Sequence, residues 1–278
     1  MARRFVAGRT VDDAIAIATA LNKKEMSVSI DNLGENVTTI EEAIKSAELY
    51  HQILDEIEKR QLKANVSVKL THMGLDVDES LARSLVCKLI AHAAKINNFV
   101  RVDMEGSRYT QKTLNFVHET HRIPGNQGRI GAVIQSYMKS SLADVEKLLA
   151  DHIRIRLCKG AYKEPPEIAF QKKSDVDANY LRVAKILLKS GIYHGLATHD
   201  EHIIRQITTF AKTEKVPREA FEFQMLHGIR RDLQETIVRE GWRMRVYLSF
   251  GTEWYPYFMR RLAERPANAV FIAKNLFR

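Results

Sequence analysis

The chain has 278 residues, of which 45% are hydrophobic and 28% are charged, and its formal net charge is +9 at pH 7. This composition is typical of a folded globular protein and excludes an intrinsically disordered chain. The 43 Lys and Arg residues are interspersed with 34 Asp and Glu residues, without blocks of like charge. We therefore expect no nucleic-acid partner, while contact with an anionic membrane surface stays open.

The two cysteines, Cys87 and Cys158, form no CxxC motif, so a disulfide framework is not expected. No apolar run approaches the roughly 20 residues that span a bilayer. The first five residues lack the apolar segment of a signal peptide. These features predict a cytoplasmic protein, which could lie peripherally at the inner face of the membrane.

Short runs rich in β-branched residues alternate with amphipathic stretches of helical period. A helical segment is expected first, within residues 1–24 and centred on Arg3–Asn22. The predicted strands follow at Met26–Ile30, Asn65–Leu70, Phe99–Met104, Ile130–Gln135, Ile153–Leu157, His194–Ala197, Phe221–Met225 and Met244–Leu248. Predicted helices between them include Thr39–Arg60, Ser80–Ile96, Asp177–Lys189 and Ile229–Gly241.

Several helix starts carry capping signals. Thr39 and Glu42 fit a capping box, and Asp12 and Ser141 are expected to cap their helices. Strands that alternate with helices indicate parallel strands joined by crossover helices. A doubly wound sheet is the alternative, but no GxGxxG turn follows the first strand. The sequence therefore predicts an α/β fold, a single (βα)8 TIM-like barrel over residues 1–278. An extra N-terminal helix and a C-terminal helix over the active-site face would complete it.

Polar residues follow the predicted strands in almost every unit, at the barrel end where chemistry takes place. Three chemistries fit them. Metal-assisted hydrolysis would use His72, His199, His227, Asp103 and Asp200, but no His-x-His pair lies on the first strand, so no metal is expected. Schiff-base chemistry would use Lys69 or Lys159. Cofactor redox chemistry would use Arg156, Lys159, Lys69 and the pair Arg260-Arg261. The residue types alone do not separate the last two.

The C-terminal segment contains a candidate carboxylate clamp. Tyr257, Arg260, Arg261 and Glu264 are spaced so that they share one side of a helix. Two neighbouring guanidinium groups bind a carboxylate well because each can donate two parallel hydrogen bonds. An arginine pair held only by Glu264 is the simpler interpretation, but Tyr247 at the preceding strand end favours the clamp.

This segment resembles the signature of the proline dehydrogenases, especially the stand-alone bacterial type. The resemblance continues in family order through Leu33-Gly34-Glu35, Ser67-Val68-Lys69-Leu70-Thr71, Asp103-Met104-Glu105, Gln135-Ser136-Tyr137, Arg156-Leu157-Cys158-Lys159-Gly160-Ala161-Tyr162, Ala197-Thr198-His199-Asp200 and Glu222-Phe223-Gln224-Met225-Leu226-His227-Gly228. It implies FAD-dependent oxidation of L-proline to Δ1-pyrroline-5-carboxylate. Hydride would pass to flavin N5 and electrons then to a quinone, as the first step of proline catabolism.

The resemblance also implies roles for individual residues. Arg156, Lys69 and Asp103 match catalytic positions, with Arg156 near flavin N5. Residues matching the proline site are Arg260, Arg261, Lys69, Tyr247, Tyr257, Leu226 and Glu35. Tyr247 holds the position associated with preferring proline over hydroxyproline, and Glu35 the position that latches onto Arg260. Residues matching flavin contacts are Gln135, Arg156, Lys159, Gly160, Tyr162, Thr198, His199, Gln224 and Glu264. A barrel that binds a flavin or an anion without turnover is the non-enzymatic alternative.

Overall fold

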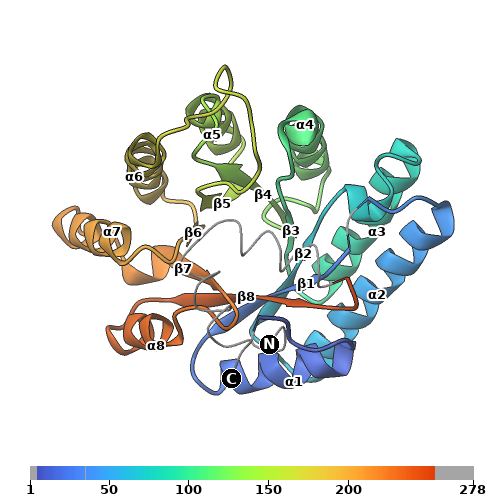
Figure 1. The fold of residues 1–278 in the computed structure, drawn as a ribbon. Coiled ribbons are helices and arrows are strands. Elements are labelled where there is room, and N and C mark those ends of the chain that lie inside the picture. Colours follow the sequence, from blue (N-terminus) through green and yellow to red (C-terminus); the bar gives the residue numbers. More distant parts are fainter. Residues whose placement is uncertain (1–4, 35, 254–278) are drawn as a thin grey trace, which may run out of the picture.

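The computed structural model describes residues 5–34 and 36–253 of the chain. Eight parallel strands close into a barrel in sequence order, and β8 pairs with β1 (Figure 1). The strands are β1 (Ser27–Asn32), β2 (Ala64–Val68), β3 (Val100–Val102), β4 (Ile130–Gln135), β5 (Arg154–Cys158), β6 (His194–Ala197), β7 (Phe221–Leu226) and β8 (Met244–Phe250). The predicted barrel is confirmed: β4 and β6 match their predicted bounds, and the other strands differ by one or two residues at an end.

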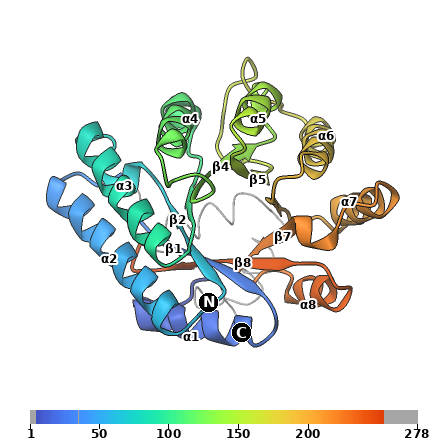
Figure 2. The same cartoon turned by 180° about the vertical axis from the view of Figure 1, so that it is seen from behind.

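Helices surround the barrel on its outer side (Figures 1 and 2). They are α1 (Val11–Asn22), α2 (Ile40–Lys59), α3 (Glu79–Lys95), α4 (Ser107–Arg122), α5 (Ser141–Ala150), α6 (Lys173–Lys189), α7 (Glu201–Thr213) and α8 (Arg231–Arg239). Two short 3-10 turns, η2 (Thr71–Met73) and η3 (Arg218–Ala220), lie in the connections. Within the described residues, no helix is both long enough and apolar enough to cross a membrane.

The N-terminal helix is shorter than expected and covers the barrel seam. Residues 5–10 are not helical, and α1 contacts β1, β8 and α2. The prediction that Asp12 caps this helix was wrong. Thr10 is the N-cap, because its hydroxyl accepts from the Asp13 amide while the Asp13 carboxylate accepts from the Thr10 amide. Helix α1 therefore lies over the pairing of the first and last strands.

Two other cap predictions had different outcomes. Thr39 is the N-cap of α2 and its hydroxyl accepts from the Glu42 amide, as predicted. The Glu42 carboxylate accepts a hydrogen bond of 2.8 Å from the amide of Thr38. Ser141 was wrongly predicted as a cap: it is the first residue of α5, and Ser140 occupies the cap position without a side-chain hydrogen bond.

The barrel interior is polar, which is unusual because such barrels are generally filled with branched aliphatic side chains. Alternate strand residues such as Val66, Val68 and Val102 belong to the buried hydrophobic core. Side chains of the opposite parity meet inside the barrel: Arg156 of β5 donates to Ser29 of β1 and Ser67 of β2. In strands such as β1, β2, β5 and β8, the alternation therefore separates an apolar outer layer from a polar interior.

Candidate active site

A cavity of about 620 Å³ opens at the carboxyl-terminal ends of the strands. This volume is in the range of small-molecule sites. Apolar side chains including Val133, Met225 and Leu226 form part of its lining. Charged side chains also line it, among them Asp31, Lys69, Asp103, Arg156 and Lys159, and so does the phenol of Tyr247. The arrangement combines an apolar surface with convergent polar groups.

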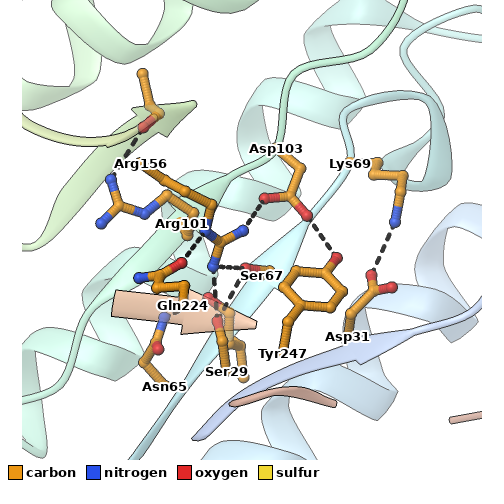
Figure 3. A network of polar contacts seen from close by, with 12 residues as sticks. Ser29, Asp31, Asn65, Ser67, Lys69, Arg101, Asp103, Arg156, Gln224 and Tyr247 are labelled. Carbon is orange, nitrogen blue, oxygen red and sulfur yellow. Dashed lines mark hydrogen bonds and ion pairs between the residues drawn. The ribbon is translucent and has the colours of Figure 1, made fainter. Parts of the chain in front are cut away.

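Arg156 is the centre of the polar contacts below this cavity (Figure 3). Its guanidinium is 2.6 Å from Asp103 Oδ1 and donates to Gln224 Oε1 at 2.6 Å. It also donates to the hydroxyls of Ser29 and Ser67, at 3.0 and 3.1 Å. The centre of the Tyr247 ring lies 4.9 Å from the guanidinium carbon. The partners of Arg156 therefore belong to β1, β2, β7 and β8 and to Asp103, which follows β3. Arg156 is therefore held in one orientation by several strands.

Asp103 connects Arg156 to Tyr247. The Tyr247 hydroxyl donates to Asp103 Oδ2 at 2.6 Å, while Oδ1 of the same carboxylate faces Arg156. Burial raises the pKa of Tyr247 well above its usual range, and the carboxylates of Asp103 and Asp31 add to this effect. Tyr247 therefore stays a neutral hydrogen-bond donor at physiological pH. It was expected at the end of the last strand, but β8 continues to Phe250, so Tyr247 lies within the strand.

Lys69 and Asp31 form a second ion pair at the cavity, 2.9 Å apart (Figure 3). The Lys69 side chain is 12% exposed and that of Asp31 only 1%. Burial raises the pKa of Asp31, and the Lys69 ammonium opposes that rise. No role was predicted for Asp31. Its signal in the sequence is the alternation of Ser27, Ser29 and Asp31, which places polar side chains on the inner face of β1.

Lys159 lies on the β5–β6 side of the cavity between two carboxylates. Its ammonium is 2.5 Å from Asp177 Oδ1 and 2.9 Å from Asp200 Oδ2. Partial burial opposes the ionisation of Asp200, but hydrogen bonding and attraction from Lys159 lower its pKa to about 2. Asp177 and Asp200 were not predicted as partners, because they belong to different βα units and meet only when the barrel closes.

The remaining predicted cofactor residues lie around the same cavity. Gln135 donates to the Glu105 carbonyl oxygen at 3.1 Å, and the Thr198 hydroxyl accepts from the Asp200 amide at 3.1 Å. His199 Nε2 accepts from the Leu226 amide at 2.9 Å, so its proton is on Nδ1 when the ring is neutral. Tyr162 packs against the small apolar cluster of Tyr137, Met138 and Ala169.

Gly160 has a backbone conformation that favours glycine, with φ of +108°. A Cβ atom at this position would lie 2.2 Å from the ring of Tyr137. The loop after β5 therefore approaches Tyr137 more closely than any other residue type permits.

The structure brings most of the predicted site residues to one place. The lining includes Lys69, Asp103, Gln135, Arg156, Lys159, Gly160, Tyr162, Thr198, His199, Gln224, Leu226 and Tyr247. The predicted residues Glu35, Tyr257, Arg260, Arg261 and Glu264, and the predicted C-terminal helix, lie outside the described residues.

Two of the carboxylates considered for a metal site form ion pairs with basic side chains instead. Asp103 faces Arg156 and Asp200 faces Lys159. His72 is buried, and burial together with Lys69 lowers its pKa to about 4. Within residues 5–34 and 36–253, no three His, Cys, Asp or Glu side chains gather as a metal site would require.

Comparison with known proteins gives the same family throughout. The family model described as "Proline dehydrogenase" matches residues 14–274. The chain is 38% identical to "Proline dehydrogenase 1" of Bacillus subtilis subsp. natto over 277 residues, covering 100% of this chain and 91% of that protein. It is also 38% identical to "Proline dehydrogenase" of Deinococcus radiodurans over 283 residues, covering 100% of this chain and 90% of that protein.

A solved structure shares the fold. The crystal structure of proline utilization A (PutA) from Bdellovibrio bacteriovorus inactivated by N-propargylglycine superposes with a TM-score of 0.88 at 27% identity. The match covers 94% of this chain and 32% of that longer chain. Since the family model covers most of the chain and full-length relatives exceed 30% identity, the chain belongs to the proline dehydrogenase family.

Proposed function

We propose that this protein oxidises L-proline to Δ1-pyrroline-5-carboxylate with FAD as its cofactor and passes the electrons to a quinone. The family membership and the names of the full-length relatives support the reaction. The observation that carries the proposal is the joint placement of Lys69, Asp103, Arg156 and Tyr247 around one cavity at the active end of the barrel.

The residues of the cavity fit a flavin. Val133, Ala197 and Met225 offer apolar contacts to a flat ring, and Gln135 and Gln224 offer amide groups to its polar edge. Lys159 and Lys173 line one side, where their ammonium groups would donate to phosphate oxygens in place of their present partner Asp200. We propose that Gln135, Arg156, Lys159, Gly160, Tyr162, Thr198, His199 and Gln224 hold the cofactor. FAD, when bound, would supply a two-electron acceptor for the hydride that leaves the ring carbon beside the proline nitrogen.

Proline is expected to lie beside Lys69, Leu226 and Tyr247. The Lys69 ammonium, already paired with Asp31, is positioned to attract the proline carboxylate. The predicted clamp of Arg260 and Arg261, with Tyr257, would complete this binding site, and Glu35 would close over it. Leu226 and the Tyr247 ring would contact the pyrrolidine ring. Several contacts of this kind lower the barrier by fixing the reacting carbon in place.

The described carboxylates at the cavity are poor candidates for a general base. Asp103 accepts from both Arg156 and Tyr247, and Asp31 is paired with Lys69. Each carboxylate would have to give up these contacts before taking a proton from the substrate. We therefore propose that the proton of the substrate ammonium leaves to water before proline reacts.

A quinone acceptor implies approach to a membrane, because quinones dissolve in lipid. The net charge of +9 would favour contact with an anionic membrane surface. Peripheral binding is therefore part of the proposal, and it does not require a spanning helix.

Product analysis tests the reaction. Purified protein supplied with FAD and a soluble quinone analogue is incubated with L-proline or D-proline, and the product is identified by mass spectrometry. We expect a product two hydrogens lighter than proline from the L-isomer, formed together with reduced quinone. Bound flavin without product from either isomer would instead favour the non-enzymatic flavin-binding protein.

A further inference from the structure

A second cavity, of about 700 Å³, lies at the opposite end of the barrel, where the strands begin. Its lining includes Asn65 of β2, Arg101 of β3, Arg154 of β5 and Arg245 of β8, each near the amino-terminal end of its strand. The proposed reaction uses none of these four residues. The cavity is as large as many sites for small molecules.

The lining of this cavity carries more positive than negative charge. Its basic residues are Lys63, Lys95, Arg101, Arg129, Arg154, Arg156 and Arg245. Its acidic residues are Glu58 and Glu222. Glu222 is already saturated, since it accepts from Arg245 at 2.5 Å, Gln224 at 2.6 Å and Tyr193 at 2.7 Å. Glu222 therefore pairs with Arg245, and Asp103 pairs with Arg156, whereas Arg101, Arg129 and Arg154 form no ion pair within the described residues.

Arg101 is buried, at 5% exposure. Its Nη1 donates to the carbonyl oxygens of Arg154 at 2.7 Å and Ala132 at 2.9 Å. No carboxylate of the described chain lies within ion-pair distance of it. Gly131 makes room for it, because a Cβ there would lie 2.6 Å from Nη1. A buried guanidinium that bonds only to carbonyl groups keeps its full positive charge uncompensated.

Arg154 and Arg129 add to this charge. The Arg154 guanidinium carbon lies 5.3 Å from the centre of the Phe99 ring and 5.8 Å from that of Tyr193. Arg101 contacts the same Phe99 ring at 4.7 Å, so one ring lies against two cations. Arg129 donates to the Asn97 side-chain oxygen at 2.6 Å. Neither Arg154 nor Arg129 forms an ion pair with the described residues.

The positive charge also affects the pKa of the neighbouring His194. Burial, and then repulsion from Arg101 and Arg154, lower the pKa of His194 to about 3. The pKa of Arg101 is itself lowered, first by burial and then by Arg156 one layer above. The cations at this end of the barrel therefore destabilise one another.

We propose that the cavity at the amino-terminal end of the barrel binds a small phosphate-bearing molecule through Arg101, Arg129 and Arg154. Planar guanidinium groups match phosphate oxygens through paired hydrogen bonds. Figure 3 shows Arg101 beside Arg156, and Arg156 and Gln224 line both cavities. A bound phosphate would therefore lie one side-chain layer below Arg156 and relieve its repulsion with Arg101.

Calorimetric titration of the FAD-loaded protein with inorganic pyrophosphate tests this site. About 0.15 M NaCl in the buffer screens weak surface binding. Arg154→Gln is the main variant, because the Arg154 side chain is only partly buried and Arg154 lines this cavity and not the one at the other end. Arg101→Gln is the second variant. Arg182→Gln, at an exposed position on α6, removes the same charge elsewhere and serves as the control.

Saturable binding of one pyrophosphate per chain is expected for the wild type and for Arg182→Gln. The affinity should fall about tenfold or more in Arg154→Gln and Arg101→Gln, since each loses charge-assisted hydrogen bonds. Two results would overturn the proposal: no saturable binding by the wild type, or an Arg154→Gln affinity equal to that of the wild type. Neither result depends on proline oxidation, so the proposed function is tested separately.

Discussion

Side chains from different strands hold the charged groups of the candidate active site in pairs. Asp103 lies between Arg156 and Tyr247, and Asp31 faces Lys69. Each carboxylate is almost fully buried, so its partner matters more than at a surface, where an ion pair contributes little. Removing one partner of such a pair should therefore affect the free energy of unfolding and the binding of substrate differently.

Replacing Lys69 separates these two effects. Lys69→Met leaves the Asp31 carboxylate buried without its cation, and we expect a loss of about 3–5 kcal/mol in the free energy of unfolding. The double variant Lys69→Met with Asp31→Asn should recover much of that stability. The KM for proline should stay raised in both, because both lack the ammonium. Urea unfolding and steady-state kinetics measure the two quantities. A normal KM in either variant contradicts the role of Lys69 in carboxylate binding.

Tyr247 is expected to set the preference for proline over hydroxyproline. Tyr247→Ser removes the ring beside the proposed substrate position and opens space for a hydroxyl group. The ratio of kcat/KM values should shift toward hydroxyproline by about tenfold. Tyr247→Phe is the control, since it keeps the ring and loses only the hydrogen bond to Asp103, with an expected cost of about 1–2 kcal/mol in stability. The same ratio in Tyr247→Ser and wild type would refute the assignment.

The conformation of the loop between β5 and α6 depends on Gly160. Gly160 combines a φ of +108° with close contact to Tyr137. Gly191 at the end of α6 has a φ of +74°, but a Cβ there meets nothing within 4 Å. Both positions therefore have a positive φ that favours glycine, but only at Gly160 would a Cβ atom collide with a neighbouring side chain.

Gly160→Ala should displace this loop and weaken FAD binding by about tenfold or more, because Lys159 beside it belongs to the proposed cofactor site. Gly191→Ala should lose about 1–2 kcal/mol in stability through strain alone and bind FAD normally. Fluorescence titration of the apoprotein with FAD compares them. Equal FAD affinities for the two variants would remove the loop from the cofactor site.

The elements were largely predictable from sequence, and their side-chain partners were not. Period-two runs of Val and Ile fixed the strands, because a strand must bury one face against helices. Which inner side chains meet depends on how the barrel closes: Tyr247 and Asp103 bond across a separation of 144 residues. Sequence therefore predicted that Lys69, Asp103, Arg156 and Tyr247 are site residues, but not the pairing of Lys69 with Asp31. Asp12 was mistaken for a cap because Thr10 and Asp13, which form the capping box, lie on either side of it.

The whole molecule should lose stability in mild acid because several buried histidines are neutral. The pKa of His194 is lowered to about 3, and those of His72 and His227 to about 4, chiefly by burial. A lowered histidine pKa contributes stability that is complete above the unfolded value near 6.5 and is lost as the pH falls toward the folded value. Each histidine therefore adds a slope of about 1.4 kcal/mol per pH unit over that window.

Between about pH 6 and pH 4, the unfolding free energy of His194→Gln should depend less on pH than that of the wild type. The difference corresponds to about one proton fewer taken up on unfolding. Urea unfolding at a series of pH values gives the slope. His202→Gln, at an exposed position on α7, is the matched control and should leave the slope unchanged. An unchanged slope in His194→Gln would show that this histidine does not stay neutral on folding.

Anaerobic addition of L-proline to the FAD-loaded protein, followed by absorbance, tests whether this barrel oxidises proline with a bound flavin. We expect the flavin spectrum to bleach with L-proline and not with other amino acids, because the proposed proline site adjoins the proposed flavin site. A fully occupied flavin that L-proline does not bleach would contradict it and leave a binding protein. A chain that takes up no FAD would contradict it more completely, because the residues around the cavity would then have no redox cofactor to hold.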